Sequence, residues 1–365
     1  ASARRLVVTA PASGDEVRVT VTPSWREPVT ITVKLGESAR RRYVWTRVTE
    51  KVAFPARDGA GALVHRNKMW LVGGWNPAPW FPKLTGNDVW SSSDGARWTR
   101  EKPNTFVDGR FDAKRDWEGR HTGGYATFRD KMWIVGGDPL VGHYQGDVWS
   151  SDDGRAWTRV SPRAPWGDRA LHYTLVFRDR LWVLGGQTMP DFVDADDTGI
   201  RFALFDDVWS SPDGERWEKV PAVGPRWAPR GAIGGSAVHD GKMWVIGGGT
   251  YESLNAGHPG RTYYADAWSS TDGSRWTLET DQVPWPAREY HSLATWDGRL
   301  WVVAGYNDAG NIGDAWYSVD GRSWYPSTDE PIAWDPRHAA SLWVYKDAIY
   351  LAGGGDEDVW KLSRR

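Results

Sequence analysis

Short apolar runs, each ending in a pair of small residues, recur along the chain. They occupy 69–74, 132–137, 181–186, 243–248, 300–305 and 349–354. A tight polar turn, such as 129–131, joins each run to another short run before it. Runs of this length between polar turns are typical of strands, and unbroken apolarity indicates burial on both faces. The pattern therefore predicts repeated pairs of adjacent strands.

A second motif follows each apolar run, with the consensus Asp-Val-Trp-Ser-Ser-x-Asp-Gly-x-x-Trp. Its copies, some slightly changed and the last truncated, begin at Asp88, Asp147, Asp207, Asp266, Asp314 and Asp358. The copies are roughly 45–60 residues apart, a length that suits one four-stranded propeller blade with a variable loop. The Asp-Gly pair is typical of a hairpin turn, because Gly readily adopts positive φ. We name the four expected strands a to d, with the apolar run as strand b and the Asp-Val-Trp segment as strand c.

Six repeats predict an all-β fold, a six-bladed β-propeller. The sixth repeat stops at Arg365, before its strand d, whereas residues 43–48 match the strand d of 155–160. We expect 43–48 to complete the last blade, which leaves no open seam between the first and last blades. The chain would then consist of a propeller over 43–365 and a β extension over 1–42, outside the repeat. Alternating residues at 17–22 and 29–34 predict a short hairpin in that extension.

The repeat resembles the Kelch family. The resemblance is carried by the Gly-Gly pair after strand b, by the Trp on strand d, and by an Arg-x-x-His start of strand a, complete at 169–172 and 288–291. It covers about 43–365. The Ser-x-Asp-Gly-x-x-Trp turn also resembles a shortened Asp-box, a structural turn of sialidase-type propellers. Kelch propellers include enzymes, sugar-processing proteins and adaptors, so the resemblance implies a fold and leaves the function open.

Composition narrows the classes of partner. The chain has 27 Trp, and 16 of them recur at one position each of strands b, c and d, where they would serve packing between blades. A net charge of −2 argues against a nucleic-acid partner, and no apolar run is long enough to predict a membrane span. There is no Cys, which excludes thiolate metal sites and the Cys–Tyr cofactor of the copper-radical Kelch oxidases. We expect no cofactor. The chain starts at Ala1, which fits either a cleaved export signal, hence a secreted or periplasmic protein, or a trimmed boundary.

The connections d–a and b–c should meet at one rim of the propeller, which is the candidate functional face. Every blade starts strand a with an aromatic-x-x-Arg motif. The arginines are Arg57, Arg120, Arg169, Arg230, Arg288 and Arg337. They would either form an anion-attracting funnel with stacking aromatic residues or each pair with a nearby carboxylate or backbone group. His172 and His291 occupy the family's usual His position, where structural hydrogen bonding and ligand binding are both open.

Departures from the six-fold repeat point to specific chemistry. The residue after each Arg is in turn Asp58, His121, Ala170, Gly231, Glu289 and His338. Long b–c loops add aromatic candidates for a binding platform, which are Trp75, Trp80, Tyr251, Tyr263 and Tyr264. The acidic loop 187–206 is read as solvated rather than as a Ca²⁺ site.

Two functions remain open. The first is a non-catalytic module that binds a carbohydrate, another anionic or polar ligand, or a protein on this face. The second is a sugar-modifying enzyme that resembles the Kelch-type sialate mutarotases and acts on an acidic sugar. Its candidate acid–base groups are Glu289, Asp58 and His291. Because Arg288 and His291 flank Glu289, we expect a lowered carboxyl pKa there, which suits a base.

Overall fold

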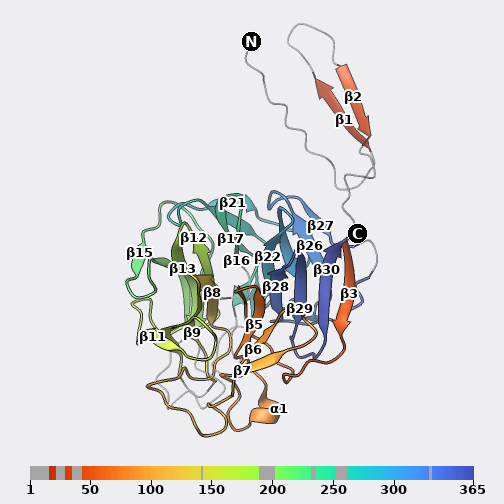
Figure 1. The fold of residues 1–365 in the computed structure, drawn as a ribbon. Coiled ribbons are helices and arrows are strands. Elements are labelled where there is room, and N and C mark those ends of the chain that lie inside the picture. Colours follow the sequence, from red (N-terminus) through yellow and green to blue (C-terminus); the bar gives the residue numbers. More distant parts are fainter. Residues whose placement is uncertain are drawn as a thin grey trace.

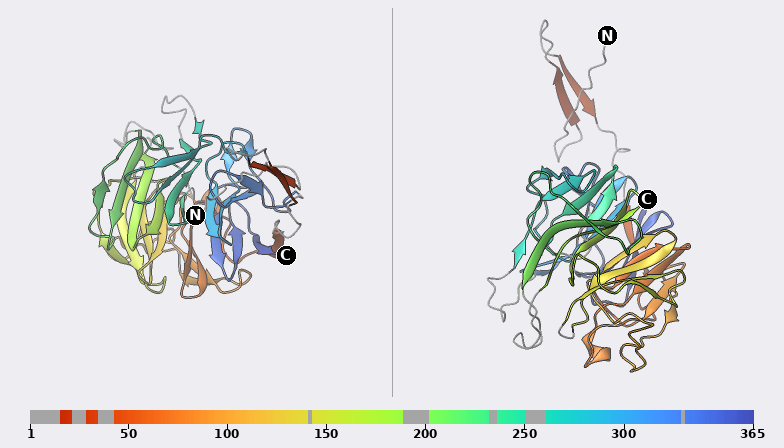
Figure 2. Two further views of the ribbon diagram at one scale, coloured as in Figure 1. Left: turned by 90° about the horizontal axis from the view of Figure 1, so that it is seen from above. Right: turned by 90° about the vertical axis from the view of Figure 1, so that its left-hand side faces the viewer.

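The computed structural model describes residues 43–140, 143–188, 202–231, 236–250, 261–328 and 331–365, and the backbone of 16–21 and 29–34. Six four-stranded antiparallel sheets in this part of the chain surround a central axis (Figures 1 and 2). The predicted six-bladed β-propeller is confirmed. Among the described residues, no helix has the length and apolar character needed to cross a membrane.

Each blade consists of four strands in the order a to d, and the a strands of neighbouring blades contact one another around the axis. Blade 1 comprises β4 (Gly61–His65), β5 (Lys68–Val72), β6 (Val89–Ser92) and β7 (Thr99–Lys102). Blade 2 comprises β8 (Gly124–Phe128), β9 (Lys131–Gly137), β10 (Gln145–Ser151) and β11 (Thr158–Ser161). Blade 3 comprises β12 (Tyr173–Phe177), β13 (Arg180–Thr188), β14 (Ala203–Ser211) and β15 (Glu218–Val220). Blade 4 comprises β16 (Ser236–His239), β17 (Lys242–Ile246), β20 (Ala267–Ser270) and β21 (Thr277–Thr280). Blade 5 comprises β22 (Ser292–Trp296), β23 (Arg299–Val303), β26 (Ala315–Ser318) and β27 (Trp324–Pro326). Blade 6 comprises β28 (Ser341–Tyr345), β29 (Ala348–Ala352), β30 (Val359–Arg364) and β3 (Tyr43–Thr49).

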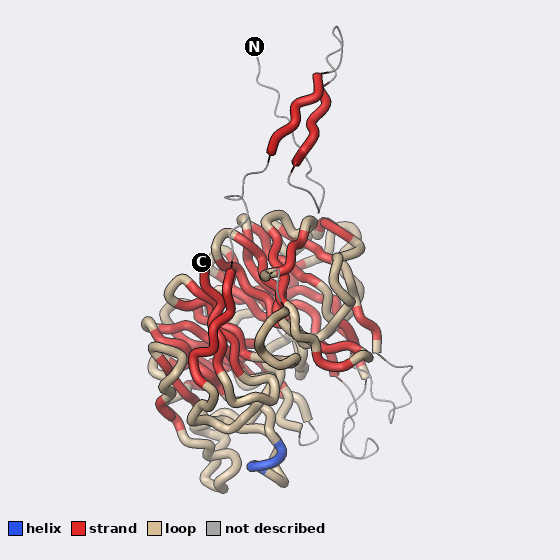
Figure 3. The backbone as a smooth tube through the Cα atoms, turned by 90° about the vertical axis from the view of Figure 1, so that its right-hand side faces the viewer, coloured by secondary structure: helices blue, strands red, loops and turns tan. Residues whose placement is uncertain are grey.

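The remaining elements are short. In the N-terminal extension, β1 (Glu16–Val21) pairs antiparallel with β2 (Val29–Lys34). The b–c connections carry the helix α1 (Pro77–Trp80) and two small ladders. These ladders pair β18 (Gly249–Thr250) with β19 (Thr262–Tyr263) and β24 (Tyr306–Asn307) with β25 (Gly310–Asn311). Figure 3 shows α1 at one end of the propeller, on a loop that extends beyond the strands.

The propeller is closed by the two ends of the repeat region, as the sequence predicts. Strand β3 pairs with β30, with Trp45 opposite Leu362 and Arg47 opposite Trp360. In the other blades, the Gly of the c–d turn packs against the strand-b aromatic residue of the preceding blade. Blade 6 has no such turn because its strand d comes from the other end of the chain. Tyr43 takes that place, with its ring edge-on to Trp301 at 4.7 Å.

The c–d turns are held by the side chains that their motif supplies. In blade 1, the hydroxyl of Ser92 accepts the backbone N–H of Gly95 at 2.8 Å, and the carboxylate of Asp94 accepts that of Ala96 at 2.9 Å. The indole N–H of Trp98 donates to the Gly95 carbonyl at 2.9 Å. The same bonds recur in blades 2 to 5. The carboxylate of this Asp therefore stabilises the turn itself by accepting its backbone N–H groups.

Candidate ligand site at the channel mouth

The six repeated arginines are part of the blade framework. In blade 1, Arg57 donates to both carboxylate oxygens of Asp88, at 2.8 and 3.0 Å, and to the Gly73 carbonyl at 2.9 Å. The indole N–H of Trp90 donates to the same carboxylate at 2.8 Å. Burial alone would raise the pKa of Asp88, but these bonds outweigh it and lower that pKa. The strand-c Asp is thus the partner that each Arg requires.

The same arrangement occurs in every blade. The ion pairs are Arg57–Asp88, Arg120–Asp147, Arg169–Asp207, Arg230–Asp266, Arg288–Asp314 and Arg337–Asp358. Each of these arginines is at most 2% exposed. The pairing alternative of the sequence analysis therefore describes all six, and their prediction as ligand contacts finds no support in this geometry.

The aromatic residue three positions before each Arg also belongs to the framework. Trp117 lies edge-on to Trp157, the strand-d Trp of the same blade, with ring centroids 5.8 Å apart. Equivalent pairs occur in all six blades. The aromatic-x-x-Arg motif therefore fastens the start of strand a to strands c and d of its own blade.

His172 and His291 lie between blades rather than at the rim. His291 is buried, and its Nε2 lies 3.0 Å from the carbonyl oxygen of Ile246 in blade 4. Burial, with Arg288 adding to it, lowers the pKa of His291 to about 4. Burial and Arg169 lower the pKa of His172 to about 3. Both imidazoles are therefore neutral at physiological pH, which favours a structural role.

We call the six positions directly after the arginines the mouth positions. In blades 1 to 5 the mouth residue joins the b–c loop of its own blade through an isolated β-bridge, and in blade 6 Arg337 pairs with Ile312 in the b–c loop of blade 5, so the d–a and b–c connections meet at one rim. The next residue along has positive φ in five blades, in Gly59, Thr122, Leu171, Tyr290 and Ala339. These five residues donate or accept backbone hydrogen bonds between blades, for example from Gly59 N–H to Ala339 O at 2.9 Å. The resulting kink separates each of these mouth side chains from the preceding Arg and, in blades 3 and 5, from the His two residues further along.

Asp58, His121 and His338 form a cluster at adjacent mouth positions. The Nε2 atoms of His121 and His338 lie 3.5 and 3.7 Å from the two oxygens of Asp58. Asp58 is 8% exposed, and its Oδ1 and the Nδ1 of His121 have no hydrogen-bond partner. Burial raises the pKa of Asp58 to about 7 and, with a contribution from His338, lowers that of His121 to about 3. The cluster is thus a buried polar group whose bonding is incomplete.

Glu289 lies at the mouth position of blade 5 and is 1% exposed. Its Oε1 lies 3.4 Å from Nη1 of Arg261. Burial raises the pKa of Glu289 to about 8, although Arg261 opposes the shift. The expectation of a lowered pKa is therefore wrong. Arg288 is directed to Asp314 and His291 to blade 4, so Glu289 does not converge with either of them.

The aromatic platform of the sequence analysis is only partly exposed. Trp80 is 6% exposed and packs over Arg57, with 5.0 Å from the guanidinium to the ring centroid, whereas its neighbour Phe81 is 80% exposed. Trp75 pairs with Asp58 through a β-bridge. Tyr263 donates its hydroxyl to Asp308 at 2.9 Å. Tyr251 and the acidic segment 189–201 lie outside the described residues.

Sequence reasoning missed the residues that surround His338. Tyr290 and Tyr306 flank its ring, with centroids at 5.7 and 5.6 Å. Nδ1 of His338 lies 2.7 Å from the side-chain oxygen of Asn311 in β25. Arg261 lies over Tyr306 at 5.0 Å. The signal that could have identified these residues is their place beside the mouth positions: Tyr290 directly follows Glu289, and Arg261, Tyr306 and Asn311 lie in b–c loops.

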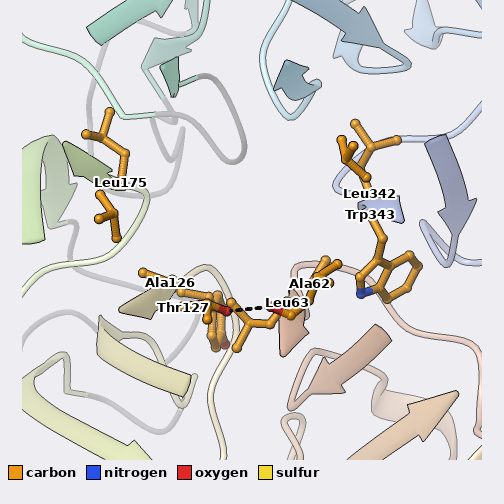
Figure 4. A pocket seen from close by; sticks show the side chains of 11 residues that line it. Ala62, Leu63, Ala126, Thr127, Leu175, Leu342 and Trp343 are labelled. Carbon is orange, nitrogen blue, oxygen red and sulfur yellow. Dashed lines mark hydrogen bonds between the residues drawn. The ribbon is translucent and has the colours of Figure 1, made fainter. Parts of the chain in front are cut away.

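A separate cavity lies among the inner strands. It has a volume of about 340 Å³ and is lined by residues 62–64, 125–127, 175–176 and 342–344. Figure 4 shows side chains from four a strands around it, with the hydroxyl of Thr127 donating to the Val64 carbonyl at 3.0 Å. Most of the residues that line it are of apolar types, with Tyr125 and Thr127 as the hydroxyl-bearing exceptions.

Neither a scan of protein-family models nor a search of curated proteins gives a match for this chain. Within the described ranges, no group of three or more His, Asp or Glu side chains is placed to hold a metal ion.

Proposed function

We propose that the chain is a Kelch-type propeller that binds a polar, hydroxyl-bearing ligand of the carbohydrate class at the channel mouth, as a non-catalytic module. The observation that supports this most strongly is the Asp58–His121–His338 cluster. Its buried polar atoms lack partners, and such atoms are costly to leave unbonded. Ligand hydroxyl groups would supply the missing bonds, and Tyr290 and Tyr306 would pack against the sugar ring.

The structure changes the kind of ligand that we propose. The sequence interpretation included an anionic ligand attracted by the six arginines, but their charges are already balanced by six aspartates. A polar ligand held by hydrogen bonds fits the mouth better than an acidic sugar held by an arginine ring. Two further proposals rest on the sequence alone. They are that the protein is secreted or periplasmic, and that a protein ligand binds on the same face.

A glycan screen followed by NMR titration of each ligand that it detects tests this proposal. We expect Asp58→Asn to weaken binding at least about tenfold, the effect of losing a hydrogen bond to a charged group. Glu215→Gln is the matched control, because Glu215 is an exposed carboxylate on a c–d turn at the opposite rim. Equal affinities of wild type and the Asp58 variant would remove the cluster from the binding site.

A second candidate function, sugar modification, is favoured by Glu289. Its raised pKa leaves the carboxyl partly protonated near neutral pH, so it could act as a general acid beside Arg261. NMR measurement of anomer exchange on a bound sugar tests this. Glu289→Gln should retain binding and lose about 10²–10⁴-fold in turnover. Absence of exchange with wild type on every bound sugar would leave the binding function alone.

A further inference from the structure

The charge balance of the mouth is acidic once the internal ion pairs are set aside. Each repeated Arg is buried against its own Asp, so none of the six contributes free positive charge. Among the described residues, the imidazoles of His121 and His338 face Asp58, and burial lowers the pKa of both, so both are neutral near pH 7. Glu289 has Arg261 as its cationic partner, with Asp308 close enough to raise its pKa. Among the described residues of the mouth, Asp58, when it is ionised, is a carboxylate without a cationic partner.

The hydrogen-bonding pattern of the cluster indicates what is missing from it. The side-chain oxygen of Asn311 can only accept, so Nδ1 of His338 must donate to it. The neutral ring then has no proton on Nε2, and this atom faces Asp58 Oδ2 at 3.7 Å. When Asp58 is ionised, Nε2 of His338 and Oδ2 of Asp58 are two acceptors that face each other, and Asp58 Oδ1 is a third acceptor without a hydrogen-bond donor among the described residues. A group that completes the cluster must bring several donors.

A protonated primary amine meets this requirement. An ammonium group has three donors and no acceptor, whereas a hydroxyl group has a single donor. Its charge would also balance a buried carboxylate that has no cationic partner. Of the two tyrosine rings beside His338, Tyr306 already has the Arg261 guanidinium over its face at 5.0 Å, so Tyr290 is the ring that suits the ammonium. The side chain of His338 is one third exposed, which leaves a route to the cluster from solvent.

We propose that the ligand of the mouth carries a free amino group, as in an amino sugar without an N-acetyl group, and that its ammonium is held by Asp58 with Nε2 of His338 as a further acceptor. This inference rests on the proposed function, because it names the class of carbohydrate bound at the same mouth. Glu289 in blade 5 and Arg261 in the b–c loop of blade 4 would form hydrogen bonds with neighbouring hydroxyl groups of the sugar.

The pH dependence of binding follows from the ionisation of Asp58. An ammonium favours the ionised carboxylate, so binding releases the proton that burial retains on Asp58. The titratable groups that face Asp58 are His121 and His338, and those near Glu289 are Arg261 and Asp308. Affinity for the amine should rise as pH increases through about 7 and then fall when the amine itself loses its proton.

The test is calorimetric titration of the full chain with three sugars of one length. They are a glucosamine oligomer, its N-acetylated form and a neutral glucose oligomer, all with a chelator to remove trace metal. We expect the free amine to bind about 10–100-fold more tightly than the other two, the size of a charge-assisted hydrogen bond. Asp58→Asn should abolish this preference, and His338→Phe, which keeps an aromatic ring but removes Nε2, should reduce it. Glu215→Gln should preserve it.

The two proposals fail in different ways. Equal or tighter binding of the N-acetylated or neutral oligomer would overturn the amine inference and leave carbohydrate binding in place. No binding of any of the three by folded wild type would overturn both. A thermal unfolding curve for each variant separates loss of the amine preference from loss of the fold. If His338→Phe is unstable, the result with Asp58→Asn decides, because this substitution keeps the shape of the side chain.

Discussion

At the residue scale, the sequence reveals both halves of the repeated ion pair but not their partnership. The arginines and the strand-c aspartates recur once per blade, yet the two members are 21 to 38 residues apart. Their contact depends on how the start of strand a folds back over strand c. Because Arg is mostly exposed in proteins, an Arg repeated at a rim is naturally interpreted as a surface charge. Burial of all six could only be established from the structure.

The buried ion pairs predict a large and non-additive effect on stability. Arg230→Met should destabilise the fold by about 3–5 kcal/mol, because it leaves the carboxylate of Asp266 without its cationic partner. Asp266→Asn should have a similar effect through Arg230. The double variant should lose clearly less than the sum of the two, which denaturant unfolding measures. Additive losses would show that the two charges do not depend on each other.

At the scale of elements, strands were more predictable than loops. The match between 43–48 and the d strands identified β3 as the closing strand, because each d strand carries the same Trp signature. Helix α1 and the β18–β19 and β24–β25 ladders were not predicted. They lie in b–c loops that differ from blade to blade, so no repeat indicates their conformation. Asn311, which orients His338, lies on one of these ladders.

Closure by β3 predicts that the fold depends on a short segment that is distant in sequence from β30, the C-terminal strand with which it pairs. Deleting residues 1–50 removes all of β3 and exposes the edge of β30, so we expect loss of folding or a large fall in Tm. Deleting residues 1–34 keeps β3 and should change Tm little. Circular dichroism melting curves compare the two. An unchanged curve after the longer deletion would contradict the closure mechanism.

At the scale of the whole molecule, function depends on where six-fold repetition breaks down. The mouth positions of blades 5, 6, 1 and 2 carry Glu289, His338, Asp58 and His121, whereas those of blades 3 and 4 carry Ala170 and Gly231. The sequence identified this asymmetry and selected Asp58 and Glu289. It could not show that Asp58 lies between two imidazoles, because its contact with His338 joins blades 1 and 6, which are adjacent only after the ring closes.

The same buried groups affect the pH dependence of stability in opposite directions, the histidines in one direction and the two acids in the other. His121, His172 and His291 have folded pKa values of about 3 to 4, below the unfolded value near 6.5, so the stability they contribute is lost as pH falls below 6.5. Asp58 and Glu289 have raised folded pKa values, of about 7 and 8. The stability they contribute is present below pH 4 and is lost as pH rises to 8.

Removing the two acids should therefore change the slope of stability against pH. In a double variant, Asp58→Asn with Glu289→Gln, the stabilisation by the neutral histidines is no longer opposed. Relative to wild type, we expect the free energy of unfolding to increase between pH 4.5 and 8, by about 1–4 kcal/mol at about 1.4 kcal/mol per pKa unit. Urea unfolding at several pH values measures this difference, with Glu215→Gln as a control that should stay parallel to wild type. If the double variant also stays parallel, both carboxyl groups ionise in the folded protein as they do in the unfolded chain, and burial at the mouth does not control their charge.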